Sequence, residues 1–160
     1  MSTGILGNCS DQSDAENRRR RYCPTNGDKG QSVHSETLRH LIKKSCRAEI
    51  KGEGYYFCPA PDCDTVYFHR ENGQTFEKKD LIVRVGLKET EDPVWVCYCF
   101  DVSKKMIREE MEAEGYSVSV DRIRQGISAK SCACDTKNPS GHCCLGAVLA
   151  FEGEVQKNQV

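Results

Sequence analysis

The chain has 160 residues, a formal net charge of −1 and a hydrophobic content of 38%. This length suits one domain or two small ones, and the near-neutral charge gives no indication of a nucleic-acid partner. No apolar run reaches the length of a membrane span, and the first residues lack the basic start and apolar core of an export signal. We therefore expect a cytoplasmic protein that does not insert into a membrane.

Eleven residues are cysteine, which is a high and odd number for a chain of this length. An odd count without an export signal argues against a secreted disulfide framework. In a cytoplasmic protein, clustered cysteines more often bind metals or carry out redox chemistry. Because a small hydrophobic core stabilises a fold only weakly, metal sites are expected to supply part of the folding free energy.

The segment 1–21 is polar and has no hydrophobic periodicity, so we predict a disordered tail. It ends in a run of four arginines at 18–21, which no aromatic residues interleave. In the segment 22–30, Cys23 and a proline precede two glycines, a pattern typical of a metal knuckle followed by a turn. A short helix is expected to begin at Ser35, because apolar residues then recur at helical spacing.

The middle of the chain is rich in aromatic and β-branched residues, which predicts strands. The predicted strands cover residues 55–57, 65–69, 74–76 and 81–85. Asn72-Gly73 is a hairpin turn signal between the second and third of them. We predict a β-rich module over residues 22–92, which ends in the charged, proline-terminated segment 88–93.

The remainder of the chain, residues 93–151, is predicted to be mainly helical and is followed by a polar tail at 152–160. The predicted helices begin at Ser103, at Ser119 and near Cys144, and the first two end at Gly115 and Gly126.

Six of the eleven cysteines lie in two stretches, 96–103 and 132–144, that flank the predicted pair of helices. The C-x-C spacing of Cys97 and Cys99 favours a [2Fe–2S] cluster, whose irons need four terminal thiolates in all. The helix N-termini after Ser103 and near Cys144 would direct N–H groups at such an anion. Zinc and a redox dithiol remain alternatives, although their usual spacings are C-x2-4-C and C-x-x-C.

The stretches Val96-Cys97-Tyr98-Cys99 and Asn138-Pro139-Ser140-Gly141-His142-Cys143-Cys144-Leu145-Gly146, with Cys134 before the second, resemble the BFD-like [2Fe–2S] domain. They are most similar to the form at the amino-terminal end of CopZ copper chaperones. The resemblance includes the upstream cysteines and covers roughly residues 22–151. It implies four cluster ligands, which are Cys97, Cys99, Cys134 and Cys144. Cys132 and Cys143 are the runners-up.

The same resemblance implies an upstream zinc site with Cys23, Cys58 and Cys63 as ligands. Asn26 stands where a second knuckle cysteine would be expected. A structural zinc site should be closed by a fourth protein ligand. The candidates among the side chains are Asp28, His34, His40, Cys46, Asp62, Asp64 and His69, and the alternative to a protein ligand is water.

We therefore expect an α+β chain, in which a small β-rich zinc-binding module precedes a mainly helical BFD-like [2Fe–2S] module. The expected function is non-enzymatic transfer of one electron to a redox partner protein or metalloprotein. The alternatives are a metal-handling accessory protein for copper or iron, with a copper-handling partner, and a redox-sensing interaction module. The resemblance implies a separate copper-binding domain with an M-x-C-x-x-C loop, which these 160 residues lack. Copper delivery is therefore not expected to be the main role.

Overall fold

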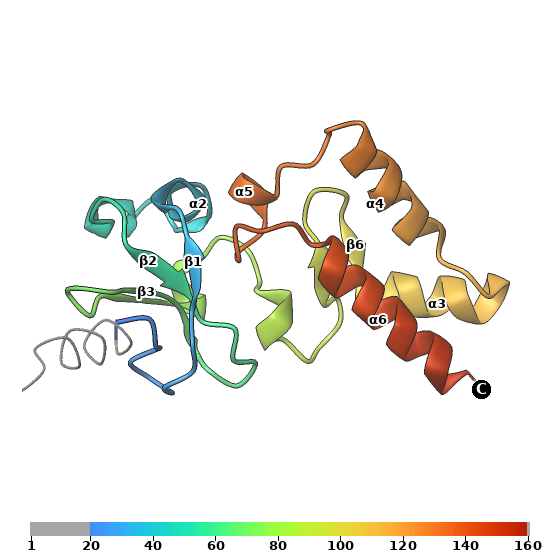
Figure 1. The fold of residues 1–160 in the computed structure, drawn as a ribbon, viewed down its shortest axis with the longest axis horizontal. Coiled ribbons are helices and arrows are strands. Elements are labelled where there is room, and N and C mark those ends of the chain that lie inside the picture. Colours follow the sequence, from blue (N-terminus) through green and yellow to red (C-terminus); the bar gives the residue numbers. More distant parts are fainter. Residues whose placement is uncertain (1–19, 160) are drawn as a thin grey trace, which may run out of the picture.

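The computed structural model describes residues 20–159. The predicted tail at 1–21 therefore lies outside the described residues, apart from Arg20 and Arg21, which belong to a turn. Figure 1 shows a sheet-based part and a helical part beside each other, with the short helix α5 between them. No helix in residues 20–159 is both long enough and apolar enough to cross a membrane.

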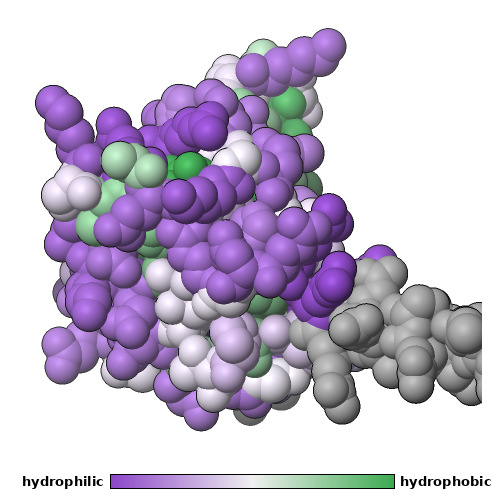
Figure 2. Space-filling model, turned by 90° about the vertical axis from the view of Figure 1, so that its left-hand side faces the viewer, coloured by the Kyte–Doolittle hydropathy of each residue, from purple (hydrophilic) through white to green (hydrophobic). Residues whose placement is uncertain are grey.

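The first part is an antiparallel sheet in the order β1-β2-β3-β4 with a helix beside it. The strands are β1 (Gln31–Val33), β2 (Tyr55–Phe57), β3 (Thr65–His69) and β4 (Thr75–Glu77), and the helix is α2 (Ser35–Leu41). Short 3-10 helices cover Arg47–Glu49, Lys78–Asp80 and Gly86–Lys88. Buried Leu38 and Ile42 pack with Tyr55 and Tyr67 in one apolar core. Figure 2 shows that the surface at this end of the molecule is mostly polar.

The prediction of a strand over 81–85 was wrong. Leu81 makes a single bridge to Ile42, after which the chain bends into a 3-10 helix. Leu81 and Val85 are both buried in the core of the sheet part, whereas Ile82 is 57% exposed. The apolar residues of this segment therefore fill the core without extending the sheet.

The second part is a two-stranded ribbon followed by helices. Its elements are β5 (Trp95–Cys97), β6 (Val102–Ser103), α3 (Lys104–Glu114), α4 (Val118–Ser128), α5 (Cys134–Lys137) and α6 (Leu145–Asn158). Ser103 Oγ accepts a hydrogen bond from Met106 N, and Gly115 ends α3 with a left-handed φ of 78°. Both predicted ends of this helix are thus confirmed.

Two helices run further than predicted. Gly126 lies inside α4, where a Cβ atom would stand 2.0 Å from the ring of Phe100. This glycine therefore serves close packing and does not end the helix. α6 continues through Asn158, so residues 152–158 are helical and not a tail. Val155 explains this length, because it is buried in the same core as Val148.

The two parts are packed against each other. α2 packs on α5, and Thr37 Oγ1 donates a hydrogen bond of 2.6 Å to Asp135 O. His142 Nε2 lies 2.8 Å from Ser32 O in β1. Lys88, at the start of the charged segment that we placed between the modules, is buried. The loop before α6 is therefore held against the sheet part.

Candidate metal centres

The first centre begins at a small hairpin. Tyr22 and Lys29 form a bridge, Cys23 N donates to Asp28 O at 2.7 Å, and Gly27 N donates to Cys23 O at 2.8 Å. Gly27 has a φ of 80°, which a residue with a side chain rarely adopts. This turn holds the Cys23 thiol in a buried position.

Cys58 and Cys63 bracket the loop between β2 and β3, and both are buried. Their sulfur atoms and that of Cys23 all lie within 4.8 Å of one another. Within residues 20–159, no other three side chains of His, Cys, Asp or Glu bring ligand atoms this close together. The structure thus brings together all three upstream cysteines that the sequence analysis singled out.

The thiols of Cys23 and Cys58 differ in how easily they ionise. Burial opposes ionisation of Cys23, but the backbone N–H groups of Asn26 and Thr25 donate to its sulfur and lower its pKa overall. Burial raises the pKa of Cys58 to about 11, although the Lys88 ammonium partly offsets this effect. Because thiolates are the metal-binding form, a cation that binds here must displace protons.

None of the side chains considered as a fourth ligand joins this group within the same limit. His69 Nε2 instead lies 3.0 Å from Glu53 O, and Cys46 Sγ lies 3.9 Å from Asp80 Oδ1. The side chain that does approach is Asn26, whose Nδ2 is 3.6 Å from Cys58 Sγ. The sequence analysis noted Asn26 only as a missing cysteine, although its position in the knuckle already indicated proximity.

The second centre gathers four cysteines from four elements. Cys97 ends β5, Cys99 follows in the turn, Cys134 begins α5 and Cys144 is the N-cap of α6. The sulfur atoms of Cys99 and Cys134 are 3.6 Å apart, and Ala133 N donates to Cys99 Sγ at 3.1 Å. Side-chain hydrogen bonds also join Cys144 to Cys97 and to Cys134.

These hydrogen bonds distribute the protons unequally. The bond from Cys144 lowers the pKa of Cys97 to about 6, with smaller help from backbone N–H groups and against the effect of burial. The same bond raises the pKa of Cys144, and burial raises that of Cys134 to about 12. Of these three thiols, that of Cys97 therefore ionises most easily.

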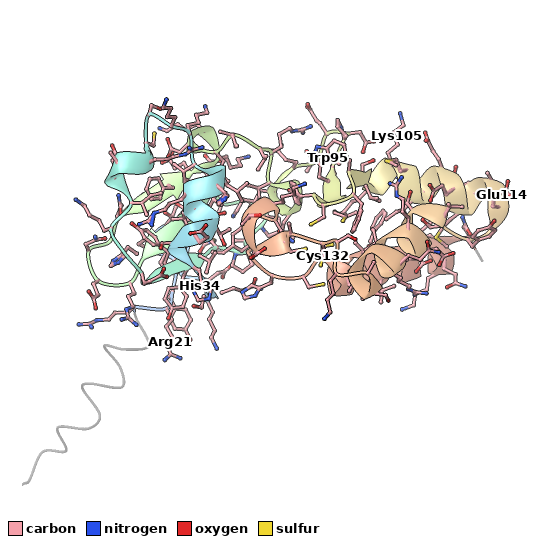
Figure 3. The ribbon with its side chains drawn as sticks, turned by 90° about the horizontal axis from the view of Figure 1, so that it is seen from above. Arg21, His34, Trp95, Lys105, Glu114 and Cys132 are labelled. Carbon is pink, nitrogen blue, oxygen red and sulfur yellow. The ribbon has the colours of Figure 1, made fainter. Side chains whose placement is uncertain are left out.

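Two further cysteines border this centre. Cys143 is exposed, and Cys132 is half-buried at the edge of the helical core. Figure 3 shows side-chain sulfur atoms beside the labelled Cys132, between α5 and the helical part.

The comparisons with known proteins support metal binding at the upstream centre. The CopZ family model described as "Zinc binding domain" matches residues 20–82, which include all three upstream cysteines. The X-ray structure of the Archaeoglobus fulgidus CopZ N-terminal domain superposes with a TM-score of 0.68 and 34% identity, covering 81% of this chain and 96% of that domain. The chain belongs to the CopZ N-terminal domain family. Its sheet part is a CopZ-like metal-binding module, and zinc is the metal named for the matching family.

A curated relative extends the comparison beyond the sheet part. The copper chaperone CopZ of Archaeoglobus fulgidus is 38% identical over 122 residues, which is 76% of this chain. The chain spans 57% of that relative's length. These names mention zinc and copper, so the BFD-like identity and the [2Fe–2S] cluster stay predictions. The likeness to CopZ favours metal handling, which the sequence analysis gave as an alternative, over electron transfer, which it gave as the expected function.

Proposed function

We propose that the chain is a non-enzymatic metal-handling accessory protein with two thiol centres. Zinc is held at Cys23, Cys58 and Cys63 in a module at 22–92. A second module, from residue 93 into α6, carries the other centre. The observation that supports this proposal best is the likeness to a copper chaperone along most of the chain. Copper is accordingly the cargo that we propose.

Cys143 and Cys132 are the thiols best suited to transient copper binding. Cys143 is exposed and lines a groove of about 620 Å³ beside α6, where a partner protein can approach. Thiolates are soft ligands that select Cu(I). Cys132 is partly accessible at the other end of the segment 132–144, which ends beside Cys143.

A copper titration tests this proposal. Cu(I) is titrated anaerobically into the full chain in competition with a chromophoric Cu(I) chelator. The wild-type chain is expected to retain Cu(I), and Cys132→Ala/Cys143→Ala is expected to bind it at least about tenfold more weakly. Cys46→Ala is the matched control, because this cysteine lies in the sheet part beside Asp80. A wild-type chain that retains no Cu(I) against the chelator would exclude copper handling.

Electron transfer is the second candidate, and the arrangement of four sulfur atoms favours it. Thiolates bound about 2.3 Å from one tetrahedral metal lie about 3.8 Å apart. The Cys99–Cys134 separation of 3.6 Å suits one iron, which leaves the neighbouring thiols Cys97 and Cys144 for a second. A [2Fe–2S] cluster needs two thiolates on each of its irons. The cluster, when bound, would supply one-electron chemistry, and these residues would hold it.

Metal analysis with EPR spectroscopy tests this second candidate. Anaerobically purified protein from iron-replete cells is expected to contain about two irons and one zinc per chain. Its reduced form should show an EPR signal that disappears on reoxidation and returns on reduction. Protein that contains zinc alone after this preparation would rule out the cluster.

A further inference from the structure

The upstream centre has three cysteines, whereas a closed structural zinc site has four protein ligands. Two other groups lie near enough to be considered as the fourth. The side chain of Asn26 approaches Cys58, and the ammonium of Lys88 approaches the loop that carries Cys63. Whether either can bind a metal depends on which of its atoms are already engaged.

The carboxamide of Asn26 presents its NH2 group to Cys58 more closely than its oxygen. Its Oδ1 accepts a hydrogen bond of 2.9 Å from Asp28 N and lies 4.0 Å from Cys58 Sγ, whereas its Nδ2 lies closer to that sulfur, at 3.6 Å. An amide binds a metal through its carbonyl oxygen, because its NH2 group is a donor only. Ligation by Asn26 would need its Oδ1, in place of its NH2 group, to be the atom nearest the thiolates. Asn26 is therefore an N–H donor to the Cys58 sulfur.

Lys88 cannot be the ligand either. Its Nζ is buried and donates to Ala60 O at 2.7 Å and to Cys63 O at 3.0 Å. An ammonium that donates hydrogen bonds has no lone pair for a metal. Lys88 instead holds the loop between Cys58 and Cys63 in place and brings a positive charge close to the thiolates.

The three thiols are buried, but the turn that carries Asn26 is not. Residues 24–29 are all exposed, and a Cβ atom added to Gly27 would meet nothing within 4 Å. The centre therefore lies directly beneath an exposed surface turn, on the side of Asn26.

We propose that a metal bound at Cys23, Cys58 and Cys63 has only these three protein ligands. The fourth coordination position is filled from solution on the Asn26 side, by water or by a thiolate. Sites with three protein ligands keep such a position open for exchange, whereas four-ligand sites are closed. This inference rests on metal binding at the upstream centre and adds that the ligand shell is exchangeable.

Zinc-edge X-ray absorption on the full chain tests the proposed three-cysteine coordination. This measurement reports only the atoms bound to zinc, so iron at the second centre does not affect it. Without added thiol, the wild-type chain is expected to show three sulfur donors and one oxygen or nitrogen donor. With 2-mercaptoethanol, it should show four sulfur donors. Asn26→Cys should show four sulfur donors without added thiol, and should release zinc to a chelator at least about tenfold more slowly.

Asn26→Ala separates a hydrogen-bond donor from a ligand. It should bind 2-mercaptoethanol with the wild-type affinity within about threefold, while zinc affinity falls about tenfold through loss of the N–H···S bond. Asn26→Ser, which keeps an acceptor for Asp28 N–H, is the second variant if the alanine variant does not fold. Thiol binding more than about tenfold tighter in both variants would show that Asn26 occupies the position.

Two other results would overturn the inference. Four sulfur donors in the wild-type chain without added thiol would mean that a fourth cysteine of the protein closes the site. A chain that holds no zinc at these cysteines would overturn this inference and the zinc part of the proposed function together.

Discussion

The phenol of Tyr67, in β3, donates a buried hydrogen bond to the backbone carbonyl oxygen of Pro139, 72 residues later in the chain. Burial raises the pKa of Tyr67, so the hydroxyl remains a donor at all ordinary pH values. Pro139 lies in the loop between Cys134 and Cys144. This bond therefore ties the loop of the second centre to the sheet that carries the first.

Replacing Tyr67 by Phe is expected to destabilise the protein by about 1–3 kcal/mol. The change leaves Pro139 O buried without its partner, and an unsatisfied buried acceptor carries this cost. Urea denaturation measures the effect. Tyr116→Phe is the matched control, because Tyr116 is 52% exposed, and it should change stability by less than about 0.5 kcal/mol. Equal stabilities for the two variants would contradict a structural role for the Tyr67 bond.

Loss of zinc is expected to weaken the second centre. Cys58→Ser should remove zinc and loosen β2 and β3, and through Tyr67 and Thr37 it should loosen the loop at 132–144 as well. Amide hydrogen exchange across that loop should become at least about tenfold faster. Cys46→Ser, in the same part of the molecule, should leave exchange there unchanged. Unchanged exchange in Cys58→Ser would mean that the two parts are independent.

The four proposed cluster ligands can be separated from their neighbours by mutation. Replacing Cys97, Cys99, Cys134 or Cys144 singly by Ala should prevent stable cluster assembly, since each would supply one of four terminal thiolates. Cys132→Ala/Cys143→Ala should keep the visible absorption and the EPR spectrum of the reduced state. If the double variant builds no cluster, the ligand set must include Cys132 or Cys143.

Replacement by Ala should change the stability of the protein in opposite directions at two glycines that lie in helices. Gly126→Ala places a methyl group into the ring of Phe100 and is expected to cost about 1–3 kcal/mol. Gly153→Ala in α6 meets nothing within 4 Å and is expected to stabilise the protein by about 0.5–1 kcal/mol. Thermal unfolding of both variants, compared with the wild-type chain, measures these two changes in stability. A Gly126→Ala variant more stable than wild type would contradict the packing.

The metal-free protein should be most stable near pH 9. The pKa of Cys97 is lowered from 9.0 to about 6. Between these values the unfolded chain holds a proton that the folded chain has released, so stability rises with pH. Above pH 9 the order reverses, because the pKa of Cys58 is raised to about 11 and that of Cys134 to about 12. Denaturation across this range measures the profile, and Cys97→Ser should lose the rise between pH 6 and pH 9.

The amino-acid sequence was sufficient to predict the features that depend on near neighbours in the chain. The cap at Ser103 and the glycine end at Gly115 are each completed within four residues, so their side-chain chemistry was sufficient to place them. The strand pair around β2 and β3 was predictable for the same reason, because its aromatic run is local. The three upstream cysteines were recognised from resemblance, and the structure brings their thiols together.

Features that depend on contacts between distant residues could be seen only in the folded chain. The local sequence around Gly126 predicts a helix end. In the structure this glycine lies inside α4, because the ring of Phe100 leaves no room for a Cβ atom there. Residues 81–85 have side chains typical of a strand. Leu81 and Val85 nevertheless pack into the core, and the segment forms no ladder of β-sheet hydrogen bonds. The direction of the Asn26 amide depends on Asp28 and Cys58 together, and Cys58 is 32 residues away. A spacing pattern carries no information on such an orientation, because hydrogen bonds between distant segments form only when the chain has folded.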